Sequence, residues 1–151
     1  MAINAKAYVP ALVMDDGQLL TENVAILSWV AETAPQLAPG GPMGRVRLIE
    51  MLAFIAAEIH KPFIQLFFPT SEVGSKNARD GLNRRFQFIA DRLRSNYLLG
   101  DSFTVADAYF FVMVQWANML KLEIPAQLTS LANHIVSRPA VLHALKAEGL
   151  A

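Results

Sequence analysis

Apolar positions along this chain follow two periods, a strand-like one near the N-terminus and a helical one over the rest. Residues 8–20 are typical of two short strands around Asp-Asp-Gly at 15–17, because Asp-Gly supplies the positive φ angles that a tight hairpin turn requires. The continuous apolar run at 11–14 predicts a strand buried on both faces. A helix is predicted from Thr21, and the proline- and glycine-rich segment 35–42 ends it and makes the clearest break in the chain.

Beyond this break the pattern is helical throughout. A long helix is predicted from Arg45 to about Leu66, and its inward positions at three- and four-residue spacing are Val46, Ile49, Leu52, Ile55 and Ile59. Pro62 is expected to bend this helix, because proline lacks the donor N–H and its ring crowds the carbonyl four residues back. A second long helix is predicted from Lys76 to Ser95.

The most explicit helix start is Thr104. Thr104 and Asp107 form a capping-box pattern, with a hydroxyl at the N-cap and a carboxylate at the third helical position. The helix that follows, to Leu120, is apolar nearly all round, which predicts a place in the middle of the bundle. Two shorter helices are predicted near 126–137 and 140–148, so the fold class expected from the pattern is mainly α.

Composition excludes several classes of protein. With 151 residues, 54% of them apolar and 17% charged, the chain is too apolar for a disordered protein and long enough for one core. The mean hydropathy is positive, but the longest uncharged apolar run, 108–120, is shorter than the roughly 20 residues that cross a bilayer. The start of the chain lacks the pattern of a signal peptide, so we expect a cytoplasmic location.

Charge and cysteine content narrow the chemistry. The formal net charge is zero, so we expect neither nucleic acid nor an anionic membrane as a partner. An arginine cluster within 79–94 also carries aspartates and reads as a solvated helix face, with a specific anion site as the alternative. Because the sequence has no cysteine, it contains no thiolate nucleophile, disulfide or thiolate metal site.

Five motifs occur in an order and spacing that resemble the cytosolic glutathione transferases. Four of them are the strand start Val-Pro-Ala-Leu at 9–12, the turn at 15–17, the helix start at 20–26 and Phe-Thr-Val-Ala-Asp at 103–107. The fifth, Glu-Ile-His-Lys at 58–61, is similar to the bacterial beta class in particular. The resemblance covers essentially the whole chain.

The resemblance implies an all-helical C-terminal domain at 43–151, preceded by a linker at 35–42 and a partial thioredoxin-like, glutathione-binding domain at 1–34. Members of the family carry a β-α-β unit before the Val-Pro strand, and their catalytic Ser, Tyr or Cys lies in that unit. We therefore expect this chain to lack the N-terminal β-α-β unit and its catalytic group.

The resemblance also implies which residues bind glutathione. Val9 would precede a cis-proline, Pro10, and hydrogen-bond through its backbone to the cysteinyl part of glutathione like an added strand. The alternative is an ordinary trans proline at the start of a strand. Glu22 and Asn23 match the pair that holds the γ-glutamyl end at a helix N-terminus, where N–H groups and the helix dipole attract a carboxylate. Asn23 stands where the family often has Ser, and both residues also simply favour a helix start.

His60 and Lys61 resemble the beta-class pair that reaches from the helical domain toward the glutathione thiol. His60 is the catalytic candidate, because a nearby cation or donor favours a thiolate. The alternative is a structural histidine, the commoner case on an amphipathic helix. Trp116 is expected to line an apolar substrate cavity, unless it only packs in the core. No histidine spacing suggests a metal site.

The first functional hypothesis is a glutathione transferase that joins glutathione, as co-substrate, to apolar electrophiles, with weak or no activity as this chain alone. The alternative is a non-catalytic module that binds glutathione or apolar ligands, or that dimerises. A bare strand edge at 8–14 would favour a homodimer. A third possibility is that the sequence is a fragment of an ordinary enzyme of this family.

Overall fold

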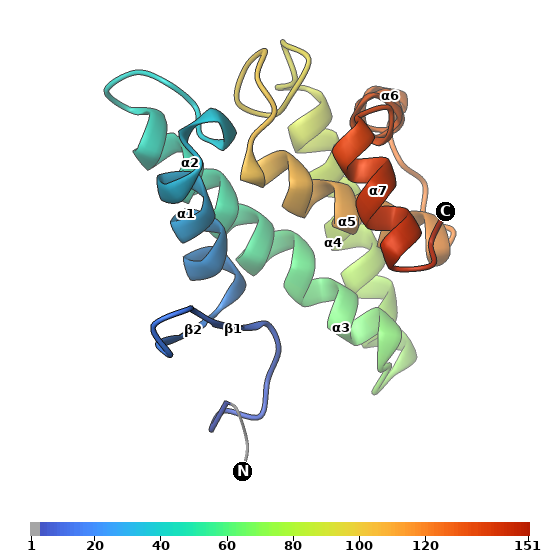
Figure 1. Cartoon of the computed structure of the whole chain (residues 1–151). Coiled ribbons are helices and arrows are strands. Elements are labelled where there is room, and N and C mark those ends of the chain that lie inside the picture. The colour runs from blue at the N-terminus through green and yellow to red at the C-terminus, as the bar shows by residue number, and fades with distance from the viewer. Residues whose placement is uncertain (1–3) are drawn as a thin grey trace.

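The computed structural model describes residues 4–151; residues 1–3, which begin the expected partial domain 1–34, lie outside the described residues. A short hairpin at one end leads into a body of helices (Figure 1). The elements are β1 (Ala11–Val13), β2 (Leu19–Thr21), α1 (Asn23–Thr33), η1 (Pro35–Leu37), α2 (Gly44–Phe54), η2 (Ile55–His60), α3 (Lys61–Phe67), α4 (Glu72–Ala90), α5 (Val105–Met119), α6 (Ala126–Val136) and α7 (Pro139–Ala147). The expected mainly α fold is confirmed.

The predicted hairpin is present, but its first strand is not buried on both faces. β1 pairs with β2 antiparallel, with Leu12 opposite Leu20, and Gly17 takes a positive φ of 83° in the turn. Val13 is 56% exposed while Leu12 is half-buried. The prediction was wrong because the sheet packs on α1 through one face and leaves the other to solvent.

α1 begins two residues later than expected and attaches the hairpin to the helices. Its N-cap is Glu22, which has a positive φ of 72°, and Asn23 is its first residue. Along its length α1 packs against α2 and α5. The hairpin is therefore held against the helical body through one short helix (Figure 1).

The long helix predicted at 45–66 is observed as α2, η2 and α3, which follow one another without a break. η2 is a π-helical segment, and it lies immediately before Pro62, where the proline ring would crowd a carbonyl of the preceding turn. Two positions predicted to face inward do not: Val46 is 53% and Ile49 is 41% exposed. The buried stripe instead runs through Leu48, Leu52, Ile55 and Ile59, because this face turns toward the central helices.

α4 begins and ends four to five residues earlier than predicted. Ser71 caps it, because its Oγ accepts a hydrogen bond of 3.0 Å from the N–H of Gly74. At the other end the N–H of Arg92 bonds to the carbonyl of Ile89 at 3.0 Å, a tight turn that closes the helix near Ala90. The capping serine was overlooked because the apolar period starts later in the helix.

α5 runs through the middle of the bundle, as its all-round apolar pattern predicted. It packs against α1, α2, η2 and α6, and nine of its residues are buried. The capping box is confirmed: Oδ2 of Asp107 accepts from the N–H and the hydroxyl of Thr104 at 2.8 and 2.7 Å. Oδ1 accepts from the N–H of Leu98 at 2.8 Å, which ties the preceding loop to the helix start.

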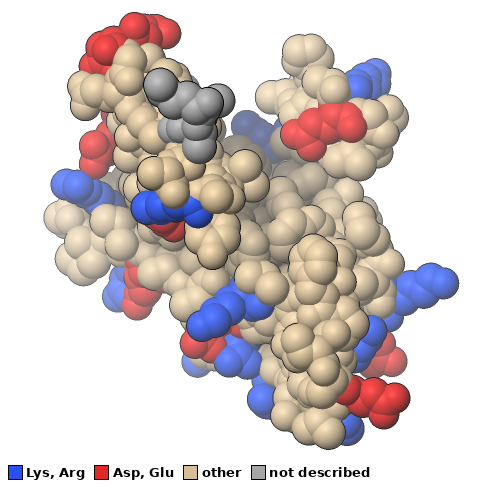
Figure 2. All heavy atoms as spheres, turned by 90° about the horizontal axis from the view of Figure 1, so that it is seen from below, with Lys and Arg blue, Asp and Glu red and all other residues tan. Residues whose placement is uncertain are grey.

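No helix in residues 4–151 combines the length and the apolar character that crossing a membrane requires. On the face seen from the hairpin end, acidic and basic side chains are intermingled among uncharged ones (Figure 2). Neither sign of charge therefore covers this face as a whole (Figure 2).

Candidate functional site

A cavity of about 530 Å³ lies between the hairpin end of the chain and the central helices. Its walls come from the segment before β1, from α1, from η2 and from α5. The lining residues are Val9, Pro10, Asn23, Leu27, His60, Ala108, Tyr109, Val112, Met113 and Trp116. Five of the seven residues singled out from the sequence thus meet around one space, although they lie up to about a hundred positions apart in the chain.

Val9 and Pro10 form the rim of the cavity nearest the hairpin. The peptide bond between them is cis, as the resemblance implied. Val9 is 92% exposed, and within residues 4–151 its backbone N–H and C=O have no hydrogen-bond partner. The structure therefore leaves the backbone N–H and C=O of Val9 free at the rim of the cavity, where an extended segment can bond to them as a strand does.

Asn23 and Glu22 lie next to each other at the start of α1 but face different surroundings. Asn23 lines the cavity. Glu22 does not, and its Oε1 lies 2.6 Å from Nζ of Lys6, which also bonds to Thr21 Oγ1 at 3.1 Å. The carboxylate that was expected to bind a ligand ammonium is thus paired with an ammonium of the chain itself.

His60 is fixed from two sides. Its Nδ1 lies 2.6 Å from the hydroxyl of Tyr109, and its ring meets the indole of Trp116 edge-on, with 5.0 Å between the ring centroids. Burial lowers the pKa of His60, and burial raises the pKa of Tyr109, with a hydrogen bond from Asn23 acting in the opposite direction. Near pH 7 the imidazole is therefore mainly neutral, with one N–H and one acceptor nitrogen.

Lys61 is exposed and does not line the cavity. It follows His60 directly at the start of α3, and consecutive helical positions point about 100° apart. The two side chains therefore do not converge on one point, and the structure brings His60 to the cavity without Lys61.

Trp116 forms one wall of the cavity and also belongs to an aromatic cluster. Its ring lies 5.6 Å from Phe63 and 5.2 Å from Phe67 between centroids, both in edge-on geometry. Trp116 therefore lines the cavity and packs with its aromatic neighbours at the same time. Its position is rigid, which suits an apolar ligand surface.

Tyr109 is the main residue that sequence reasoning missed. It lies seven residues before Trp116 on α5, so the two share a helix face two turns apart, with Val112 between them. That spacing was the available signal. It was masked by the apolar residues that surround Tyr109 in the sequence.

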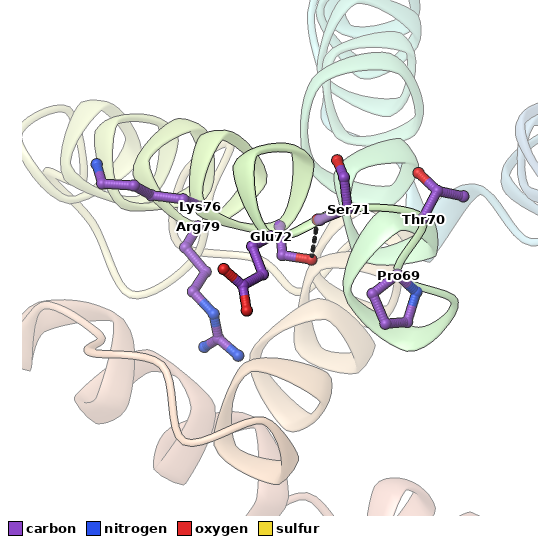
Figure 3. Close-up of a pocket in the computed structure, with 7 residues that line it drawn as sticks. Pro69, Thr70, Ser71, Glu72, Lys76 and Arg79 are labelled. Atoms are coloured by element: carbon purple, nitrogen blue, oxygen red, sulfur yellow. Dashed lines mark hydrogen bonds between the residues drawn. The ribbon is translucent and has the colours of Figure 1, made fainter.

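A second cavity, of about 510 Å³, lies at the start of α4 (Figure 3). There Glu72 and Arg79 extend to one side of the helix and Lys76 to the other, where Lys76 pairs with Asp80 at 2.6 Å. Ser75 donates its hydroxyl to the Ser71 carbonyl at 3.1 Å. These bonds lie within the first turns of α4.

Across residues 4–151, no cluster of three or more His, Cys, Asp or Glu side chains is placed to hold a metal ion.

Comparisons with known proteins agree with this picture. Residues 54–139 match the family model of the glutathione S-transferase C-terminal domain. The chain is 40% identical to glutathione S-transferase GstA of Escherichia coli O157:H7, with 99% of this chain and 78% of that protein covered. It is 32% identical to glutathione S-transferase GST-4.5 of Xanthomonas campestris pv. campestris, with 99% and 80% covered.

Solved structures are similar over the same extent. A ternary complex of BphK, a bacterial glutathione S-transferase, superimposes with a TM-score of 0.92 at 39% identity, covering 98% of this chain and 78% of that one. A sphingomonad glutathione S-transferase complexed with glutathione gives a TM-score of 0.90 at 38% identity, covering 99% and 78%. A beta-class enzyme of Sphingomonas chungbukensis gives the same values.

Proposed function

The chain belongs to the glutathione S-transferase family, and on that premise we propose that it binds glutathione in the cavity of about 530 Å³ and transfers it to apolar electrophiles. The observation that carries this proposal is a convergence. The unpartnered backbone of Val9, the first residue of α1 and the imidazole of His60 all border one space.

The peptide part of glutathione would lie along Val9. An extended tripeptide can add to that backbone as a short strand, with Pro10 fixing the direction of the rim. Its γ-glutamyl carboxylate would then reach the N-terminus of α1, where unbonded N–H groups and the helix dipole favour an anion. Asn23 provides a neutral amide there.

Glu22 would take the ammonium of the γ-glutamyl group only after releasing Lys6. The two groups lie 2.6 Å apart and both side chains are more than half exposed, so the pair is weak and open to exchange with solvent. The ligand ammonium would replace one cation with another at nearly equal charge. Lys61, which faces solvent, would contribute at most long-range attraction.

The sulfur would face His60, and the electrophile would lie against Trp116 and the apolar side chains of α5. A neutral imidazole N–H can hydrogen-bond a thiolate and lower the pKa of the thiol. The apolar wall suits a flat, hydrophobic co-substrate.

We further propose that turnover by this 151-residue chain alone is slow. The sequence contains no cysteine, and His60 is the lining side chain that we propose as the donor to the sulfur. Removal of one donor at a reacting centre typically costs on the order of 10²–10³ in rate. A chain with few such donors is expected to bind glutathione better than it activates it.

A non-catalytic binding or self-associating module is the second candidate. Large apolar side chains are exposed around α2 and on α4. They are Met43, just before α2, Val46 and Ile49 on α2, and Phe88 on α4. Such side chains on adjacent helices favour association with a second copy. A homodimer, a cytoplasmic location and the division at 35–42 stay predictions.

Two measurements on the purified chain test these proposals. Calorimetric titration with glutathione should detect binding that His60→Gln leaves nearly intact and that a bulky substitution of Asn23 abolishes. Conjugation of glutathione to an aromatic halide should be slow and should fall further in His60→Gln. Binding without any conjugation would favour the second candidate, and absence of binding would refute both uses of the cavity.

A further inference from the structure

The contact between His60 and Tyr109 joins two segments that lie far apart in the chain. Nδ1 of His60, at the end of η2, is 2.6 Å from the hydroxyl of Tyr109 on α5. Both side chains line the cavity, and Tyr109 is only 6% exposed. Trp116 closes another side of the imidazole at 5.0 Å between centroids. The ring is therefore held in one orientation, with one of its two nitrogens already engaged.

We propose that Tyr109 is a positioning residue whose hydroxyl donates to Nδ1 of His60 and so keeps the proton of the neutral imidazole on Nε2. The nitrogen that remains available to a ligand is then a hydrogen-bond donor. The consequence drawn below for glutathione rests on the proposed function, whereas the tautomer itself is a property of the free protein.

The direction of this hydrogen bond follows from the chemistry of its two groups. A phenol is a better donor than acceptor, because its ring draws electron density from the oxygen, and an unprotonated imidazole nitrogen is a good acceptor. Burial raises the pKa of Tyr109, so the phenol keeps its proton near pH 7 and has it to donate. With the acceptor nitrogen 2.6 Å away, the hydroxyl directs its proton to His60.

The neutral state of His60 makes the location of its single proton decisive. Burial lowers its pKa, so the imidazolium is a minor species near pH 7. A ring protonated on Nδ1 would present a basic Nε2 and could accept the thiol proton. A ring protonated on Nε2 instead donates to sulfur that is already ionised. In that case the S–H bond breaks with its proton passing to solvent, and His60 stabilises the resulting thiolate.

The test is ¹⁵N NMR of the full chain labelled at histidine. The sequence has three histidines, and His60→Gln assigns the signal of His60. We expect wild-type His60 to show a protonated Nε2 and an unprotonated, hydrogen-bonded Nδ1. Tyr109→Phe removes the donor, and both ring nitrogens should then move toward the intermediate shifts of a tautomer mixture. A protonated Nδ1 in the wild type would overturn the proposal without recourse to any variant.

Tyr97→Phe is the matched control. Tyr97 is also 6% exposed, and its hydroxyl accepts a hydrogen bond from the side chain of Arg138 at 3.3 Å. Loss of the Tyr97 hydroxyl should leave the ¹⁵N shifts of His60 unchanged. This control shows whether the change in Tyr109→Phe comes from the contact with His60 or from the loss of any buried hydroxyl. Equal changes in both variants, or no change in Tyr109→Phe, would contradict the assignment.

Glutathione added to the same samples separates this inference from the proposed function. If glutathione binds, the Nε2 signal of His60 should shift in the wild type. In Tyr109→Phe, kcat for conjugation should fall about tenfold while KM for glutathione stays unchanged, as for other partners that orient a reactive group. If glutathione does not bind, the proposed function fails and the free-protein shifts still decide the tautomer. A rise in KM with kcat unchanged would assign Tyr109 to binding and refute the positioning role.

Discussion

Removal of the Asp107 carboxylate should be among the most destabilising single changes in this chain. The side chain is fully buried and accepts hydrogen bonds from the N–H and the hydroxyl of Thr104 and from the N–H of Leu98, at 2.7–2.8 Å. Asp107→Ala leaves two backbone N–H groups without their acceptor at the start of the central helix. Each unsatisfied buried donor costs about 1–3 kcal/mol. The variant no longer has to bury a carboxylate, and this gain offsets part of the cost.

The net loss should be about 3 kcal/mol, a large part of the 5–15 kcal/mol that holds a typical domain together. For a chain of this size it corresponds to a fall in Tm of about 6–12 °C. Urea unfolding followed by far-ultraviolet circular dichroism measures it, provided that the m-value is unchanged. Asp101→Ala, an exposed aspartate in the preceding loop, is the control and should stay within about 0.5 kcal/mol of wild type.

A double-mutant cycle with Thr104→Val sharpens this test. Thr104→Val alone should cost about 1 kcal/mol, the usual value of an N-cap hydroxyl. Because Thr104 and Asp107 bond to each other, the double variant should lose less than the two single losses added together. Strict additivity, or an Asp107→Ala variant as stable as Asp101→Ala, would refute the view that this buried network holds the start of α5.

Three further outcomes follow from burial and charge. Burial lowers the pKa of His60 in the folded state, so the unfolded chain binds more protons just below about pH 6.5. The free energy of unfolding should therefore fall as the pH decreases from about 6.5 toward the folded pKa. Unfolding curves of His60→Gln should lack this pH dependence. Leu52→Ala should cost about 2–5 kcal/mol in urea unfolding and Ile49→Ala less than about 1, because only the first empties a fully buried site. Glu58→Gln should cost no more than about 1 kcal/mol in the same assay, since its pair with Arg85 is only partly buried.

Local chemistry explains which elements the sequence revealed. The Asp-Gly turn and the pairing of Thr104 with Asp107 each depend on neighbours within a few positions. The hairpin and the start of α5 could therefore be recognised from the amino-acid sequence. The cis bond before Pro10 is different, because it was implied by the family resemblance and not by the residues.

The errors arose where two helix faces compete. α2 carries one apolar stripe through Val46 and Ile49 and another through Leu48 and Leu52, and helical spacing fits both. Only the packing of α1 and α5 decides which stripe is covered. Periodicity therefore identified the helix but not its orientation.

Only part of the candidate site could be predicted from the sequence, for a similar reason. His60 was singled out by the resemblance to the beta class, whereas its partner Tyr109 lies 49 positions later within an apolar run. Nothing local marks such a pair, because the contact exists only after η2 and α5 pack together. Lys61 was paired with His60 on the same resemblance, and in the structure its side chain is exposed and does not line the cavity.

The π-helical segment Ile55–His60 can be understood as a one-residue insertion in an otherwise α-helical stretch. Deletion of one residue from it would restore ordinary helical hydrogen bonding and rotate all that follows by about 100° relative to what precedes. Either His60 would swing away from the cavity, or Phe63 and Leu66 would leave the core. The length of this segment is therefore fixed both by the position of His60 at the cavity and by the packing of α3 in the core. Among chains of this architecture, insertions and deletions should be tolerated far more readily in the loops than within this single turn.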